Sequence, residues 1–143
     1  MLLSEAAMYE GTVTWVGEEQ FRAVGPSRHA LLLDADRERN TGPGPMELLL
    51  LALGGCSGSD VVSILKKKRQ QVTGLSISLE GERAPEPPRV WTKIKIHFRV
   101  VGKGIEPRAV EHAIELSRTK YCSVAATLSR TAEIAWTHAI EES

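Results

Sequence analysis

Two cysteines are the residues best suited to covalent chemistry in this sequence of 143 residues. Cys56 lies in the apolar segment after Pro45, and Cys122 closely follows the basic residues Arg118 and Lys120. Cations and the free N–H groups at a helix start both stabilise a thiolate, which is the reactive form of the side chain. We therefore expect a lowered pKa for Cys122 at the start of a short helix. Taken alone, Cys56 fits a small buried hydrophobic residue equally well.

Other kinds of catalytic site find little support in the residue pattern. The sequence has no CxxC, HExxH or GxxxxGK[ST] motif, and its histidines are scattered singly at positions 29, 97, 112 and 138. Such motifs, with their residues closely spaced in the sequence, mark many zinc and phosphate sites. We expect no bound metal and no cofactor.

Length and charge narrow the class of protein further. A chain of 143 residues predicts a single domain over residues 1–143, and 18 basic residues balance 18 acidic ones. A zero net charge does not favour nucleic acid or an anionic membrane as partner. It is compatible with a small neutral substrate.

The termini, the cysteine count and the longest apolar run predict a cytoplasmic protein. Two cysteines do not match the disulfide framework of small secreted domains. The first 15 residues lack the basic region of a signal peptide. The most apolar run, Leu48 to Leu53, has six residues, whereas a span needs ~18. We expect no membrane span.

In the first half of the chain, short strands precede one long helix. Residues 9–33 carry β-branched and aromatic runs separated by turn residues, which predicts two or three strands. Residues 34–45 read as a loop, and Pro45 to about Arg69 as a helix. Its first half is apolar on all sides and should be buried on all sides. Three glycines around Cys56 predict either a kink or the close approach of another backbone.

The second half predicts a hairpin, helices and a final strand. Residues 72–84 and 90–101 alternate apolar and polar side chains, as half-buried strands do. A helix should run from Pro107 to about Thr119, followed by a short helical segment and a last strand containing Ile134 and Trp136. This order indicates an α+β fold.

Two segments resemble the osmotically inducible protein C and organic hydroperoxide resistance (OsmC/Ohr) family. The first is PGPMELLLLALGGCS, residues 43–57, together with the following DVVSILKKKR, and the second is KYCSVA around Cys122. The order of strands and helices agrees over nearly the whole chain. The resemblance implies an OsmC-like fold in which antiparallel sheets wrap around two central helices in an intertwined homodimer.

The same resemblance implies a thiol peroxidase acting in oxidative stress defence. Cys56 would attack an organic hydroperoxide or hydrogen peroxide and become a sulfenic acid, and Cys122 would condense with it to a disulfide. That division of labour agrees with thiol chemistry, because a sulfenic acid needs a second thiol before it is oxidised irreversibly. An external dithiol would be the reductant.

In the family, a Glu and an Arg support the attacking cysteine, and both matches here are inexact. The family Glu directly follows the first proline of the helix, but here Met46 holds that position and Glu47 comes next. One residue is ~100° of helix rotation, so Glu47 fits a first-turn carboxylate facing the helix dipole equally well. We prefer Arg22 over Arg28 as the arginine that supports Cys56. Both residues also fit a solvent-exposed cation on a strand or turn.

Two other functions compete with the peroxidase. In one, the apolar surface around Met46 and residues 48–53 binds a hydrophobic or fatty-acid-like ligand and the cysteines are inert. In the other, the thiols sense oxidation without turnover. Absence of a disulfide after peroxide exposure favours the first, and stoichiometric oxidation without recycling favours the second.

Overall fold

The computed structural model describes residues 8–143, and the chain divides between Leu49 and Leu50 into two compact units. In the first unit, strands β1 (Thr12–Gly17), β2 (Gln20–Val24) and β3 (Ala30–Asp34) form an antiparallel sheet in that order. The strands predicted over residues 9–33 are confirmed.

The loop after β3 is organised around the buried carboxylate of Asp34. This carboxylate accepts hydrogen bonds from the Arg39 guanidinium at 2.9 and 3.1 Å, the Thr41 hydroxyl at 2.5 Å and the Asp36 backbone N–H at 2.9 Å. Partners of this kind stabilise the ionised form. The hydrogen bond from Arg39, followed by that from Thr41, holds the pKa of Asp34 well below its usual value, outweighing the opposing effect of burial.

Helix α1 (Pro45–Lys67) begins and ends as its sequence predicts. Pro45 holds the first helical position, and the Glu47 carboxylate accepts the Gly44 backbone N–H at 3.1 Å. An acidic residue that reaches back to the first free N–H in this way is half of a capping box. Lys66 and Lys67 face the negative end of the helix dipole.

Two of the glycines around Cys56, Gly54 and Gly58, admit side chains of a neighbouring strand, and the helix continues through all three. A Cβ on Gly54 would come within 2.8 Å of a Leu79 methyl, and one on Gly58 within 2.7 Å of an Ile77 methyl. The expected close approach of another backbone is therefore wrong, because the atoms that approach Gly54 and Gly58 are side-chain atoms of the neighbouring strand.

Burial on all sides of α1 is wrong for the single chain. Leu53, Val61 and Leu65 are fully buried, but Leu49 is 43% exposed and Leu51 52% exposed.

Within the described residues, α1 is also the one helix long and apolar enough to cross a membrane, with a mean hydropathy of 1.8 over 18 residues. The core helix of a globular protein passes the same test. The expectation that the chain forms no membrane span therefore stays a prediction.

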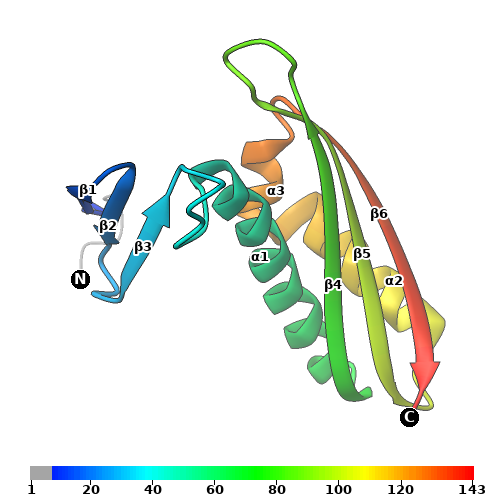
Figure 1. The fold of residues 1–143 in the computed structure, drawn as a ribbon. Helices are drawn as coiled ribbons and strands as arrows, with labels where there is room; N and C mark the ends of the chain where they lie inside the picture. The colour runs from blue at the N-terminus through cyan, green and yellow to red at the C-terminus, as the bar shows by residue number, and fades with distance from the viewer. Residues whose placement is uncertain (1–7) are drawn as a thin grey trace. The chain divides into compact units, whose positions relative to one another are not determined.

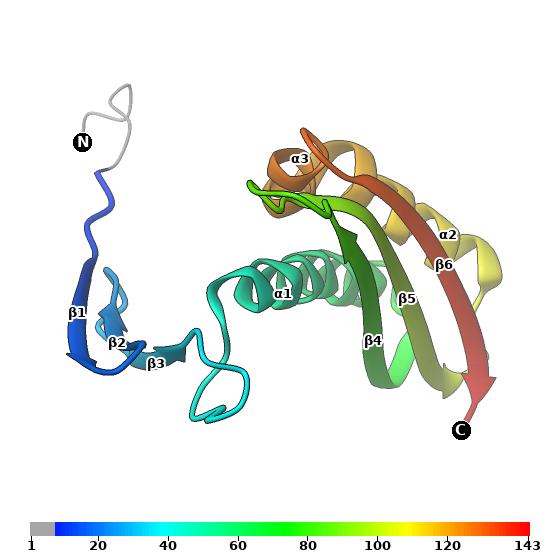
Figure 2. The same ribbon diagram turned by 45° about the horizontal axis from the view of Figure 1, so that its top comes forward.

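The second unit is a three-stranded sheet with helices on one face (Figures 1 and 2). Strands β4 (Gln71–Arg83) and β5 (Trp91–Lys103) form the predicted antiparallel hairpin. Strand β6 (Glu133–Glu142) pairs with β5 in parallel, which differs from a fully antiparallel sheet. The reason is that helices connect β5 to β6, and such a crossover returns the chain in the same direction.

The helical crossover comprises α2 (Pro107–Leu116), a π-helical turn η1 (Ser117–Tyr121) and α3 (Ser123–Leu128). Buried residues of α2 and alternate residues of β5 form the core with α1, namely Ile94, Ile96, Phe98, Val100, Val110 and Ala113. The predicted α+β architecture is confirmed, and the helix expected to reach Thr119 changes at Ser117 to the wider π turn.

Candidate functional site

The fold brings the two cysteines together although they are 66 positions apart in the sequence. Their sulfur atoms and a carboxylate oxygen of Asp60 all lie within 4.8 Å of one another. Both thiols are free, with Cys122 buried and Cys56 partly exposed. The second unit therefore contains a dithiol with an acidic neighbour.

Cys56 and Asp60 are placed by the periodicity of α1. Positions four apart on a helix lie on the same face, and here that face borders the buried stripe formed by Leu53, Ser57 and Val61. The thiol and the carboxylate thus stand at the edge of the core. This position leaves both groups partly accessible from outside.

The π turn places Cys122. The Cys122 backbone N–H donates to the Ser117 carbonyl at 2.9 Å, five residues back, and the chain then starts α3. Single π turns within helices recur at functional sites. Cys122 is the N-cap residue of α3, and its sulfur accepts the Ala125 backbone N–H at 3.3 Å. The predicted position at a helix start is confirmed.

The expected lowering of the Cys122 pKa is wrong. Burial, with only 4% of the residue exposed, is the largest effect and raises the pKa to about 11. The hydrogen bond from Ala125 opposes this rise, whereas the neighbouring Cys56 and Asp60 add to it. An apolar environment disfavours a thiolate, and here it outweighs the helix N–H.

The cations expected to stabilise the Cys122 thiolate have other partners. The Arg118 guanidinium pairs with Glu115 at 2.8 Å, and the Lys120 ammonium lies 5.2 Å from the centre of the Tyr121 ring. Adjacency in sequence therefore did not place these charges beside the sulfur.

A buried hydroxyl chain orients Asp60. The Ser57 and Ser117 hydroxyl oxygens are 2.8 Å apart, and the Ser117 hydroxyl donates to Asp60 Oδ2 at 2.9 Å. Ser117 has no exposed surface. Because the Ser117 hydrogen points to Asp60, the Ser57 hydroxyl donates to Ser117. None of these three residues was among the site residues expected from the sequence, although the i, i+4 spacing of Cys56 and Asp60 is a signal that indicates Asp60.

Asp60 also lines an open pocket beside the dithiol. This pocket has a volume of about 420 Å³ and lies between α1 and the α2–η1 segment. Ile64, Leu116 and Tyr121 give it apolar walls, while Lys67 and His112 contribute polar groups. A small molecule entering here would meet the carboxylate next to the thiols.

The two predicted supporting residues lie in the first unit. Glu47 is exposed, caps α1 and pairs with Arg37 at 3.2 Å. Arg22 is an exposed residue in the middle of β2, opposite Thr14 and Leu32. Arg28 occupies the turn before β3 with a positive φ of 67°. The structure thus gives Glu47 a capping role, and support of Cys56 by Glu47 and Arg22 stays a prediction.

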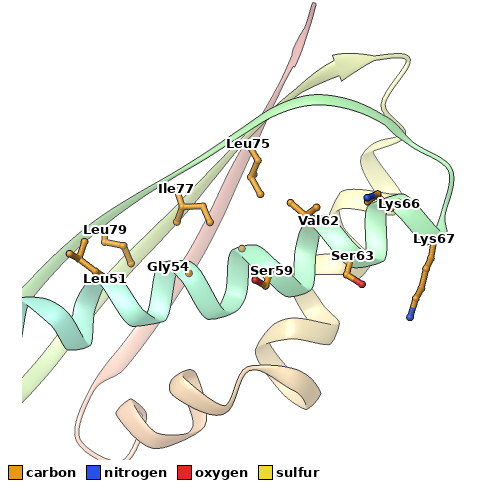
Figure 3. A pocket seen from close by; sticks show the side chains of 12 residues that line it. Leu51, Gly54, Ser59, Val62, Ser63, Lys66, Lys67, Leu75, Ile77 and Leu79 are labelled. Carbon is orange, nitrogen blue, oxygen red and sulfur yellow. The ribbon is translucent and has the colours of Figure 1, made fainter. Parts of the chain in front are cut away.

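A second feature of the second unit is an apolar groove of about 870 Å³ between α1 and β4. Figure 3 shows Leu75, Ile77 and Leu79 of β4 directed toward the helix, with Leu51 and Val62 on the helix side. Lys66 and Lys67 lie at the end of the groove. Neither cysteine lines it.

Comparison with known proteins identifies similar sequences over most of the chain. A family model described as OsmC-like protein matches residues 38–137. Protein YhfA of Escherichia coli strain K12 is 42% identical over 132 residues, which cover 92% of this chain and 96% of YhfA.

Solved structures share the fold. A hypothetical protein from Aquifex aeolicus is 32% identical with a TM-score of 0.86, covering 96% of this chain and 99% of its own. The organic hydroperoxide resistance protein OhrB of Bacillus subtilis has a TM-score of 0.63 at 10% identity, with coverages of 93% and 98%. The second likeness concerns the fold alone.

Proposed function

Because the chain belongs to the OsmC-like protein family, we propose that it is a thiol-dependent peroxidase that reduces organic hydroperoxides or hydrogen peroxide. The observation that carries this proposal is the dithiol, in which the Cys56 and Cys122 sulfurs lie within 4.8 Å of each other. Hydroperoxide resistance in structural neighbours of the same fold agrees with it.

The difference in exposure supports the division of roles between the two cysteines. Cys56 is the more accessible thiol, so its thiolate attacks the terminal oxygen of the peroxide. A sulfur–oxygen bond forms, the O–O bond breaks, and the leaving alkoxide or hydroxide takes up a proton to become an alcohol or water. Cys56 is then a sulfenic acid.

Cys122 resolves this intermediate. Its sulfur attacks the Cys56 sulfur, the disulfide forms, and the S–O bond breaks with release of water. Because the pKa of Cys122 is raised to about 11, its proton must leave during the attack. The Asp60 carboxylate is held beside both sulfurs and is placed to pass that proton to the leaving hydroxide.

An external dithiol restores the resting state by supplying two electrons and two protons to the disulfide.

We further propose that the protein works in the cytoplasm as a homodimer, with Glu47 and Arg22 supporting Cys56. The exposure of apolar residues on α1 supports the dimer, because isolated chains rarely leave large apolar patches uncovered.

The test of the peroxidase is consumption of an alkyl hydroperoxide in the presence of a dithiol. Cys56→Ser should abolish turnover and leave the thermal unfolding transition nearly unchanged, since the substitution is close in shape. Ser76→Ala, on an exposed strand position, is the matched control and should keep full activity. Undiminished turnover in Cys56→Ser would refute the proposal.

Cys122→Ser separates the two roles. This variant should complete one turnover and then accumulate Cys56 sulfinic acid, because no second thiol is available to trap the sulfenic acid. Mass spectrometry after peroxide treatment measures it. If Cys56 stayed free of overoxidation in this variant, the resolving role of Cys122 would be wrong.

The groove favours a second candidate function, binding of an apolar ligand. Its apolar wall consists of leucine, isoleucine and valine side chains, two serines also line it, and the lysines at its end suit a carboxylate head group. A fluorescent fatty acid should then bind the wild type and Cys56→Ser equally, and bind Val62→Asp poorly. Equal binding to Val62→Asp would exclude the groove as the site.

A further inference from the structure

We propose that Cys56, Asp60 and Cys122 form a binding site for a thiophilic divalent cation, with Zn²⁺ as the preferred ion. Two thiolates and one carboxylate are ligands that Zn²⁺ accepts, and three protein ligands leave a fourth position for water. The site concerns the reduced protein and does not depend on peroxidase activity.

The distances between the three donor atoms suit an ion with tetrahedral coordination. With Zn–S bonds of about 2.3 Å and a Zn–O bond of about 2.0–2.2 Å, neighbouring ligand atoms would be roughly 3.5–3.8 Å apart. The three donor atoms already lie within 4.8 Å of one another. The separations would therefore have to shorten by at most about an ångström to reach tetrahedral spacing.

Hydrogen bonds from neighbouring groups hold the proposed ligands in place. The Ser117 hydroxyl donates to Asp60 Oδ2, and Ser57 in turn holds Ser117, so one carboxylate oxygen is fixed and the other is available. The Ala125 backbone N–H donates to the Cys122 sulfur and would offset part of a thiolate charge there. Such outer partners tune metal affinity substantially.

Binding would displace one proton from each thiol to solvent and leave both sulfurs bonded to the ion. A disulfide between the same two sulfurs and a bound ion would therefore exclude each other. Local motif searches miss this site because its donors come from α1 and from the start of α3, with no CxxC spacing between them.

Cobalt spectroscopy tests the site directly. The reduced, metal-free full-length protein is titrated with Co²⁺ without oxygen, and the probe ion is then displaced with Zn²⁺. We expect one ion per chain, a thiolate-to-cobalt charge-transfer band and the strong visible bands of a tetrahedral site. Zn²⁺ should abolish these bands and protect both thiols from alkylation.

Variants define the ligands. Asp60→Asn should weaken Co²⁺ binding by at least about tenfold, and Ser117→Ala, which removes an outer partner, by about 10–100-fold with the spectrum retained. Glu133→Gln, an exposed carboxylate on β6, is the matched control and should bind like the wild type. No charge-transfer band with the wild type, or unchanged affinity in a folded Asp60→Asn protein, would overturn the proposal. A positive result with an inactive peroxidase would leave the metal site standing.

Discussion

Cys56 and Cys122 carry the same thiol group, but the surroundings of the two sulfur atoms differ. Cys122 caps a helix, a position that generally favours a thiolate, yet its burial raises the pKa to about 11. Cys56, nearby on α1, is partly exposed. In the proposed peroxidase this contrast favours attack by the accessible sulfur and resolution by the buried one, since a thiol that stays protonated survives until a sulfenic acid forms beside it.

The raised pKa of Cys122 can be measured in Cys56→Ser, where it is the sole thiol. Burial is its largest cause and persists in this variant. The rate of alkylation by iodoacetamide should therefore keep rising beyond pH 9, the ordinary value for a thiol. The unfolded variant, measured in denaturant, supplies the control.

The pH dependence of the free energy of unfolding should reflect the same raised pKa of Cys122. The folded state retains a proton that the unfolded state releases above pH 9, so the contribution of Cys122 to stability is lost between about pH 9 and pH 11. An alkylation profile that levels off at or below pH 9 in the folded variant would contradict the buried environment.

At the scale of elements, the loop after β3 depends on one buried carboxylate. Asp34 accepts hydrogen bonds from Arg39, Thr41 and Asp36, and its pKa is lowered in the folded state. A carboxyl of this kind stabilises the fold above its unfolded pKa of about 3.9, and the stabilisation is lost as pH falls toward the folded value.

Asp34→Asn should therefore lower the midpoint of denaturant unfolding at pH 7, because the Arg39 charge loses its nearest carboxylate partner. The difference from the wild type should narrow below about pH 4. Glu38→Gln, an exposed neighbour in the same loop, should unfold like the wild type throughout. A constant difference from pH 7 to pH 3 would show that ionisation of Asp34 is not the cause.

Elements with strong periodicity could be predicted from sequence, and so could the residue types of the dithiol. The alternation of Ile94, Ile96 and Phe98 fixes the buried face of β5, and Pro45 with the terminal lysines fixes α1. The π turn and the parallel pairing of β6 could not be predicted, because they follow from tertiary packing. For the same reason the distance between Cys56 and Cys122 became known only from the structure.

At the scale of the whole molecule, α1 exposes more apolar surface than its sequence predicts for a core helix. Leu51 is 52% exposed and Val62 39% exposed, and both line the groove beside β4. We predict that a second copy of the chain covers this surface. Leu51→Asp should then shift the sedimentation profile toward monomer, because a charge in an apolar interface is costly.

Ala139→Asp is the control for this prediction, since it places the same charge at an exposed position of β6. It should leave the sedimentation profile unchanged. A wild type that sediments as a monomer and binds a fatty acid in the groove would support the apolar-ligand function instead.

Because the two thiols are far apart along the chain, the proposed catalytic cycle should change the stability of the fold. A bond between Cys56 and Cys122 would close a covalent ring of about 66 residues that contains the β4–β5 hairpin and α2. Closing a loop of that length restricts the unfolded chain by about 4 kcal/mol in the chain-entropy model. Each turnover would thus alternate the molecule between a tethered and an untethered form, and its melting temperature would record its redox state.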